Sequence, residues 1–178
     1  MGEPLYSIWS LAINSVYISM LGVAITVILA LPVAVLTVRN PGWLTGLLER
    51  VTYIGYSLPG IVIALALVFF GIHYARPIYQ TPVLLIFGYV ILFMPLAVVA
   101  LRASLLQVSP ALEEAARTLG GSPIKVLRTV TLPLILPGFF SAGALVFLTT
   151  MKELPVTLIL GPPGFKTLAT SIWSAHEE

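Results

Sequence analysis

Four long apolar stretches alternate with short polar connections along this chain of 178 residues. They run from about residue 14 to 38, 51 to 72, 83 to 101 and 135 to 150. A helix needs about 20 predominantly apolar residues to cross the hydrocarbon core of a bilayer. The first three stretches meet that length, and the fourth is short for a complete crossing. The pattern therefore predicts an all-α, polytopic bundle of transmembrane helices.

Proline and glycine interrupt these stretches. Pro32 and Pro95 lie inside the first and third stretches, where each predicts a kink. Leu58-Pro59-Gly60 lies well inside the second, and we expect a broken helix there. Half-helix ends at such a break can line a path across a membrane, so Pro59 and Gly60 are candidate translocation-path residues. The segment just before, residues 42–50, is short, amphipathic and polar-ended, which favours a separate surface helix.

The polar pair Lys152-Glu153 follows the fourth stretch directly. Two interpretations stay open. Both side chains are interfacial charges that reach water, or they lie at bilayer depth, where each charge costs about 3 kcal/mol and is retained only when it faces a cavity or a partner charge. The second interpretation adds Lys152 and Glu153 to the candidate translocation path. Beyond them we expect a Pro/Gly-rich bend over residues 156–165 and a short helix over residues 167–173.

One charged segment, residues 112–137, is built for water, and we call it the island. Ser109-Pro110 is a helix start signal, and Glu113 and Glu114 suit the positive end of the helix dipole. Gly120-Gly121 ends this helix, and Ser122-Pro123 begins another. The second helix has one apolar face, formed by Ile124, Leu127, Val130 and Thr131. We expect a helix–turn–helix within a water-exposed loop of about residues 103–134.

Composition supports a membrane protein and excludes several kinds of site. Hydrophobic residues make up 58% of the chain and charged residues 9%, with a mean hydropathy of +1.04; about a quarter of residues are charged in soluble domains. A net charge of +2, spread along the chain, gives no basis for a nucleic-acid partner. The lack of cysteine excludes a disulfide framework, Cys-ligated zinc and iron–sulfur sites.

Basic residues predict the orientation in the membrane. One side of the expected topology holds Arg39, Arg50, Arg102, Arg117, Lys125 and Arg128, and the other holds Arg76, Lys152 and Lys166. The positive-inside rule then places the island in the cytoplasm and both chain ends outside. We therefore expect a single transmembrane domain, residues 1–178, that is cut before a last helix and follows a missing crossing.

The island also carries a recognisable spacing. Glu114-Ala115-Ala116 is followed after three residues by Gly120, after nine more by Val130, and after one more by Leu132-Pro133. This resembles the EAA loop of permease subunits in bacterial binding-protein-dependent ABC importers, with Val130 where Ile is commoner. The chain further resembles the ferric-iron transport permeases in four segments: residues 56–60, residues 95–97, residues 151–158 and residues 164–170.

The resemblance implies a fold and a function. It implies the MetI-like permease fold, a bacterial inner-membrane location, and a translocation path coupled to ATP hydrolysis by partner ATPase subunits. The ATPase-coupling residues that it implies are Glu113, Glu114, Ala115, Ala116, Gly120, Leu132 and Pro133. The expected partners are those ATPase subunits, an extracytoplasmic binding protein, a second permease domain and the lipid bilayer. ATP and Mg²⁺ would be bound by the ATPase, and we expect no cofactor, metal or catalytic site in this chain.

Other functions remain open alternatives. The same transporter class carries other substrates, such as thiamine, a polyamine or a phosphonate. A passive channel is disfavoured because a pore does not require a helix–turn–helix that docks a soluble subunit on one face. An intramembrane enzyme is disfavoured because the apolar stretches hold no His/Asp/Glu or Ser/His constellation. Residues 161–167 lack the adjacent Gly-Lys-Ser/Thr of a phosphate loop.

Overall fold

A computed structural model describes residues 5–177, which are helical apart from short connections. The long helices are α1 (Leu5–Arg39), α2 (Trp43–Ser57), α3 (Gly60–His73), α4 (Pro82–Gln107) and α8 (Leu136–Met151). The shorter elements are η1 (Arg76–Ile78), α5 (Pro110–Thr118), α6 (Pro123–Val126), the π-helical η2 (Leu127–Thr131), α7 (Leu132–Leu134), α9 (Pro155–Leu160) and α10 (Leu168–Glu177). The predicted all-α class is confirmed for this part of the chain.

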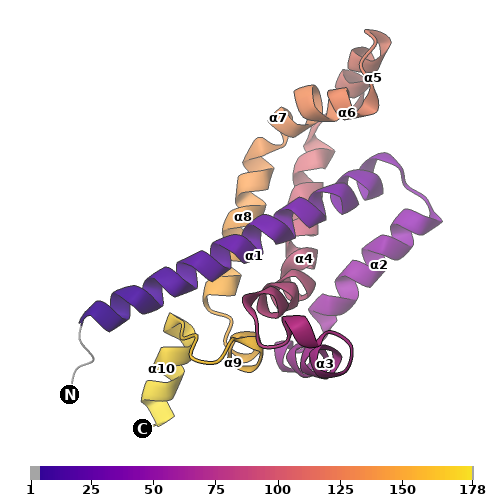
Figure 1. The fold of residues 1–178 in the computed structure, drawn as a ribbon. Helices are drawn as coiled ribbons and strands as arrows, with labels where there is room; N and C mark the ends of the chain where they lie inside the picture. Colours follow the sequence, from indigo (N-terminus) through magenta and orange to yellow (C-terminus); the bar gives the residue numbers. More distant parts are fainter. Residues whose placement is uncertain (1–4, 178) are drawn as a thin grey trace.

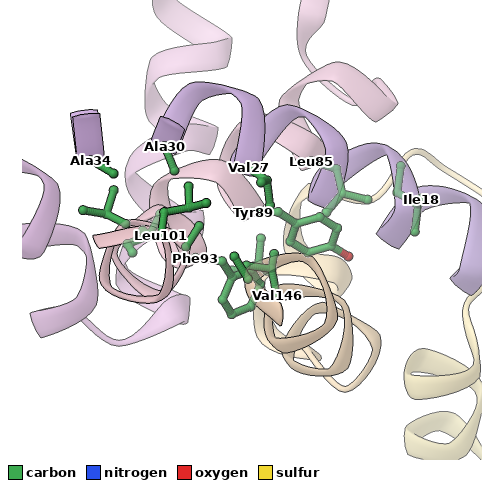
Figure 2. Close-up of a cluster of buried hydrophobic side chains, with 14 of the residues drawn as sticks. Ile18, Val27, Ala30, Ala34, Leu85, Tyr89, Phe93, Leu101 and Val146 are labelled. Carbon is green, nitrogen blue, oxygen red and sulfur yellow. The ribbon is translucent and has the colours of Figure 1, made fainter. Parts of the chain in front are cut away.

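The core forms where α1 crosses α4, with α8 packed against both (Figure 1). Ala30 and Ala34 lie one turn apart on α1 and are fully buried, so the helix backbones can approach closely. Tyr89 and Leu101 of α4 are likewise buried in this cluster (Figure 2). This apolar centre holds the two longest helices together, and the site elements extend from its two ends.

Two helices are long and apolar enough to cross a membrane, Ile8–Arg39 and Pro82–Gln107. Two bent pairs qualify if each counts as one span: α2 with α3, bent by 106°, and residues 123–134 with α8, bent by 69°. The described residues thus hold two to four crossings, against the four expected. Pro32 and Pro95 both lie within continuous helices.

The predicted break at Leu58-Pro59-Gly60 is confirmed, since α2 ends at Ser57 and α3 begins at Gly60. The prediction of a separate surface helix over residues 42–50 was wrong, because α2 continues through Arg50 to the break. The charged residue Glu49 lies within α2 and pairs with Arg102 of α4. The first span also begins earlier than expected, because α1 is already helical at Leu5; residues 1–4 of that lead lie outside the described residues.

The C-terminal part differs from the expected bend. Residues 155–160 form the helix α9, which starts with Pro155 in its first turn, where a missing N–H costs nothing. The bend is confined to the residues that follow, and α10 extends the expected short helix to ten residues. Leu168 N–H donates to Ser15 Oγ of α1 at 2.8 Å, which fixes α10 beside the N-terminal part of α1.

Small residues let α8 pack closely. A Cβ on Gly138 would overlap the side chain of Ser104 on α4. Ala142 is fully buried, and a Cβ on Gly143 would make an ordinary 3.6 Å contact with Val23 of α1. Ser141 is exposed and takes no part in this packing. The α4–α8 crossing therefore depends on Gly138 more than on its neighbours.

Candidate functional site

The island folds as α5 and α6 around a glycine turn, at one end of the molecule (Figure 1). At the end of α5, Gly120 N–H donates to Arg117 O at 2.9 Å and Gly121 N–H donates to Ala116 O at 3.1 Å. This pair of bonds is the Schellman motif, which needs a left-handed residue just after the helix. Gly120 supplies it with a φ of +84°. The helix–turn–helix predicted for the island is confirmed.

The second island helix does not bury the face that the sequence predicts. Ile124 is 70% exposed, whereas Val126 and Thr131 are buried. The reason is the register: η2 has π-helical geometry, which shifts the side chains after Val126 relative to an α-helical spacing. Only Thr131 of the four expected positions lies inside, with Leu127 and Val130 half-buried.

The predicted coupling residues lie on two different faces of the island. Glu113 is buried, while Glu114 and Ala115 are exposed and Ala116 is half-buried. Leu132 is half-buried and Pro133 exposed in α7, the helical segment that leads from η2 to the bend before α8. The structure thus separates Glu113 from the water-facing residues of the same helix.

Three large apolar side chains are exposed on the island. Leu112 is 50% exposed, Leu119 89% and Ile124 70%. Exposure of large apolar side chains to water is unfavourable, and such surfaces are commonly covered by a partner. We call Leu112, Leu119 and Ile124 the apolar tip; in a loop that the sequence predicts to lie in water, it has the chemistry of a surface that another protein covers.

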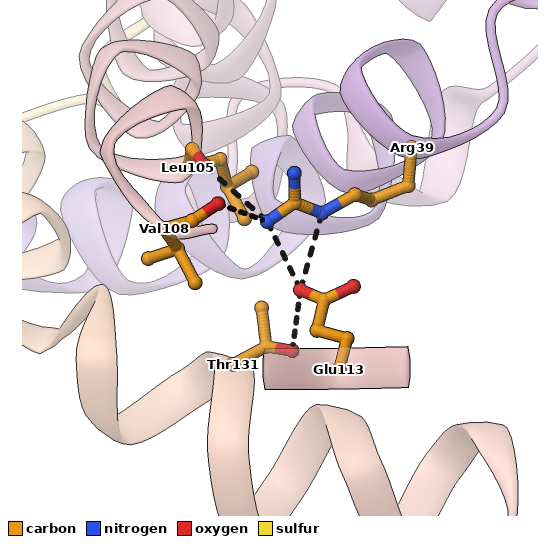
Figure 3. A network of polar contacts seen from close by, with 5 residues as sticks. All are labelled: Arg39, Leu105, Val108, Glu113 and Thr131. Carbon is orange, nitrogen blue, oxygen red and sulfur yellow. Dashed lines mark hydrogen bonds and ion pairs between the residues drawn. The ribbon is translucent and has the colours of Figure 1, made fainter. Parts of the chain in front are cut away.

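Glu113 lies at the centre of a buried polar network that the sequence did not predict (Figure 3). Arg39, the last residue of α1, donates to Glu113 Oε1 from Nε at 3.1 Å, and its Nη2 lies 3.0 Å from the same oxygen. Thr131 Oγ1 donates to that oxygen at 2.9 Å. Arg39 Nη2 also donates to Val108 O at 3.0 Å and to Leu105 O at 3.4 Å. We call these five residues the clasp.

The second candidate region lies at the other end of the bundle, where α3 and α9 pack together. Gly60 begins α3, and a Cβ placed on it would lie 3.0 Å from Glu153 Oε1. Glu153 is half-buried and accepts a hydrogen bond from Val156 N–H at 3.2 Å, in the first turn of α9. Lys152 and Pro59 are exposed. The structure therefore brings Gly60 and Glu153 together and leaves Lys152 facing outward.

Polar side chains cluster next to Glu153 inside the otherwise apolar bundle. Tyr89 and Thr157 share a buried hydrogen bond of 2.7 Å, and Thr157 Oγ1 also donates to Glu153 O at 2.6 Å. The polar residues around this point are Ser15, Ser19, Tyr89, Thr150, Glu153 and Thr157. We call them the polar cluster. The apolar neighbours of Tyr89 in sequence give no sign of a polar partner 68 positions away.

Comparison with known proteins now decides the family. Residues 22–176 match the family described as the binding-protein-dependent transport system inner membrane component. The chain belongs to this family. Its resemblance to importer permeases is thereby confirmed, as is the inner-membrane transport class that the family description states.

Named relatives point the same way. The chain is 47% identical over 160 residues to the Fe(3+)-transport system permease protein FbpB 2 of Haemophilus influenzae, covering 90% of this chain and 32% of that protein. It is 44% identical over 70 residues to a putative 2-aminoethylphosphonate transport system permease protein, PhnV, of Salmonella typhimurium, covering 39% and 26%. The chain thus spans about a third of the length of these curated relatives or less.

A solved structure supports the fold. A chain of the MetNI methionine ABC transporter, seen in inward-facing conformations, superposes with a TM-score of 0.77 at 20% identity, covering 98% of this chain and 82% of that one. The expected MetI-like permease fold is therefore confirmed.

Proposed function

We propose that this chain is a permease subunit of an ABC importer, which forms part of the substrate path and couples it to ATP hydrolysis by a partner ATPase. The observation that carries this proposal is the structure of the island. It is a short helix–turn–helix that exposes the apolar tip and is held to α1 by the buried Arg39–Glu113 ion pair. Such a helix–turn–helix suits docking into a groove of a soluble subunit. Family membership supports the same assignment.

The coupling surface is the water-facing side of α5 and the turn after it. Glu114 and Ala115 are exposed there, and Gly120 ends the helix sharply enough for Leu119 to project. The partner ATPase would bind ATP and Mg²⁺ and cover the apolar tip. Leu132 and Pro133 would carry its movement toward α8, because α7 joins η2 to the bend at residue 135.

The translocation path is proposed to pass the α3–α9 region. Gly60 begins α3 at the 106° bend between α2 and α3, and the Glu153 carboxylate lies against this start of α3. Helix breaks of this kind are tolerated in a membrane where they line a cavity or are buried in protein. Pro59 and Lys152 flank the same region from its exposed side. A second permease domain would complete the path on that side, with substrate arriving on an extracytoplasmic binding protein.

Ferric iron is the proposed substrate, supported by identity to the Haemophilus Fe(3+) permease over most of this chain. A phosphonate is the second candidate, supported by identity to the 2-aminoethylphosphonate permease over a shorter region. These two cargoes differ in charge, since one is a trivalent cation and the other carries both a phosphonate and an ammonium group. A carboxylate at residue 153 favours the ferric cation, because it would attract the ammonium group of the second cargo but repel its phosphonate group.

One experiment tests class and substrate together. The complete transporter, with this chain in its native polypeptide, is purified through a tag on that polypeptide and examined for a co-purifying ATPase. ATP hydrolysis in liposomes is then measured with its binding protein loaded with ferric iron, loaded with 2-aminoethylphosphonate, or empty. We expect ATPase recovery and stimulation by the ferric form. Failure to recover an ATPase would refute the importer assignment, and stimulation by the phosphonate form alone would replace the substrate.

A further inference from the structure

We propose that the clasp transmits movement of the island to α1, with Arg39 as the positioning residue. This inference rests on the proposed function and deepens it: the apolar tip would receive the ATPase, and the clasp would pass the displacement on. It assigns a role to a residue that has no place on the docking surface, because Arg39 is half-buried at the end of α1.

The clasp joins four elements through three side chains. Arg39 comes from α1, Glu113 from α5 and Thr131 from η2, and the carbonyls of Leu105 and Val108 belong to the C-terminal end of α4. A single oxygen, Glu113 Oε1, receives the guanidinium and the threonine hydroxyl. Arg39 at the same time donates to two carbonyls at the end of α4, of which Leu105 O also accepts from Val108 N–H at 3.2 Å. Rotation of α5 would therefore change contacts to three other elements at once.

Burial makes this connection stiff. The Arg39 and Glu113 side chains are 14% and 8% exposed, so water has little access to replace either partner. Separating the charges would leave a carboxylate and a guanidinium in a poorly solvated place, which is strongly unfavourable. The guanidinium also holds its partners in a planar fork, whereas a lysine would offer only a point charge. The pair is thus expected to move as a unit.

The other connections of α5 reach α1 less directly. Along the chain, α5 is joined to α4 through the residues around Ser109, and to η2 through the glycine turn and α6. The first connection reaches α1 only through the packing of α4 against it. Arg39 is the residue through which the described contacts of Glu113 reach α1, and α1 in turn packs along α4 and α8 and carries Ser15 of the polar cluster in its N-terminal half. The clasp therefore offers a direct route from the island to the candidate path.

A second ion pair supplies a matched control. Arg102 of α4 pairs with Glu49 of α2, with side-chain exposures of 29% and 26%. It joins two helices near the same end of the bundle without contacting α5. Arg102→Gln therefore removes an arginine of comparable size from an ion pair, and any general effect of losing a charge in this region will appear in that variant too.

The test compares Arg39→Gln, Arg39→Lys and Arg102→Gln in the complete transporter. Three quantities are measured: abundance in the membrane, recovery of the ATPase subunit, and substrate imported per ATP hydrolysed. We expect Arg39→Gln to keep the first two and to lower the third about fivefold or more, the lower end of typical coupling between sites. Arg39→Lys should recover only part of the ratio, because its ammonium still pairs with Glu113 but lacks the planar fork that also holds the carbonyls of α4. Arg102→Gln should match the unmodified transporter.

Other results would overturn the proposal. An unchanged import-to-ATP ratio in Arg39→Gln, or a fall equal to that in Arg102→Gln, would show that the clasp transmits nothing. A fall in ATPase recovery together with the ratio would show that the clasp only shapes the docking surface. If Arg39→Gln fails to accumulate, Glu113→Gln decides, since it keeps the volume and an acceptor for Thr131; a normal ratio there contradicts the proposal. Absence of an ATPase from the unmodified transporter would instead refute the proposed function itself.

Discussion

Gly60 and Glu153 lie against each other, although one begins α3 and the other precedes α9. A Cβ on Gly60 would stand 3.0 Å from Glu153 Oε1 and 3.4 Å from Val156 Cγ2. The break in the second span and the polar pair after the fourth stretch therefore form one region. Two helices start side by side there, in a bundle whose other close contacts are mostly apolar.

Gly60→Ala should lower substrate import while leaving abundance normal. The new methyl group would crowd the Glu153 carboxylate and displace it from the opening of α3. Alanine favours a helix more than glycine does, so a loss of import would not reflect a weakened α3. Gly46→Ala in α2 is the control, because a Cβ there meets nothing within 4 Å. Equal import by both variants would mean that the Gly60–Glu153 contact has no part in transport.

Glu153→Gln should impair import at normal abundance. The amide oxygen can still accept from Val156 N–H, so the first turn of α9 keeps its hydrogen bond while the charge is lost. Lys152→Gln, which changes an exposed neighbour, should have a smaller effect. Import assays in cells lacking the unmodified permease would measure both. Unaltered import by Glu153→Gln would leave the carboxylate with only a helix-capping role.

Gly138→Ala should destabilise the α4–α8 crossing by about 1–3 kcal/mol, the usual cost of forcing an extra carbon into a packed contact. The methyl group would overlap Ser104, whose side chain already fills the space. The measurement is thermal aggregation of the detergent-solubilised complex. Adding Ser104→Gly to Gly138→Ala should restore stability, since it removes the overlapping atoms. A double variant as unstable as the single one would contradict this packing explanation.

Much of the fold follows from local sequence signals. Apolar length predicts α1 and α4, the Pro59-Gly60 pair predicts the break, and Gly120 predicts the turn of the island, because each rests on backbone constraints that act within a few residues. Where long-range contacts determine the bounds of a helix, local sequence does not predict them. The helix α2 runs on through Arg50, beside a Glu49 that pairs with Arg102 far along the chain.

The site is less predictable than the fold for the same reason. The sequence singles out Glu113 as a charged island residue but gives no sign that it is buried against Arg39, a residue 74 positions earlier. Arg39 itself resembles an ordinary flanking charge of a membrane span. The π-helical register of η2, which brings Thr131 rather than Ile124 inside, is likewise invisible in an apolar spacing of 3.6 residues. Long-range pairing therefore had to come from the structure.

Glu114→Lys should weaken attachment of the ATPase subunit. Glu114 lies exposed in the middle of α5, on the surface that we propose for the ATPase, so the substitution reverses a charge at the proposed contact. The buried neighbour Glu113 would keep its clasp contacts, so the island should keep its shape. Recovery of the ATPase on purification is the measurement. Full recovery, with normal import, would remove Glu114 from the docking surface.

Gly120→Val should uncouple the transporter by altering the end of α5. Gly120 has a φ of +84°, which costs a β-branched residue about 1–2 kcal/mol or more. A Cβ there meets nothing within 4 Å in this chain, so the damage must come from the shifted turn or from the partner that covers it. ATPase recovery and substrate-stimulated ATP hydrolysis should both fall, while abundance stays nearly normal because the apolar spans lie elsewhere.

Gly164→Val provides the matched control for that substitution. Gly164 has a φ of +79° and equally open surroundings, but it precedes α10 at the opposite end of the bundle, so the same local strain falls far from the island. It should leave ATPase recovery unchanged. Gly120→Asn then separates the two causes at the turn, because asparagine tolerates the left-handed conformation yet still adds a side chain. If Asn restores recovery, backbone shape is decisive; if it does not, the ATPase approaches residue 120 too closely for any side chain. Full recovery and full import in Gly120→Val would exclude the island as the coupling element.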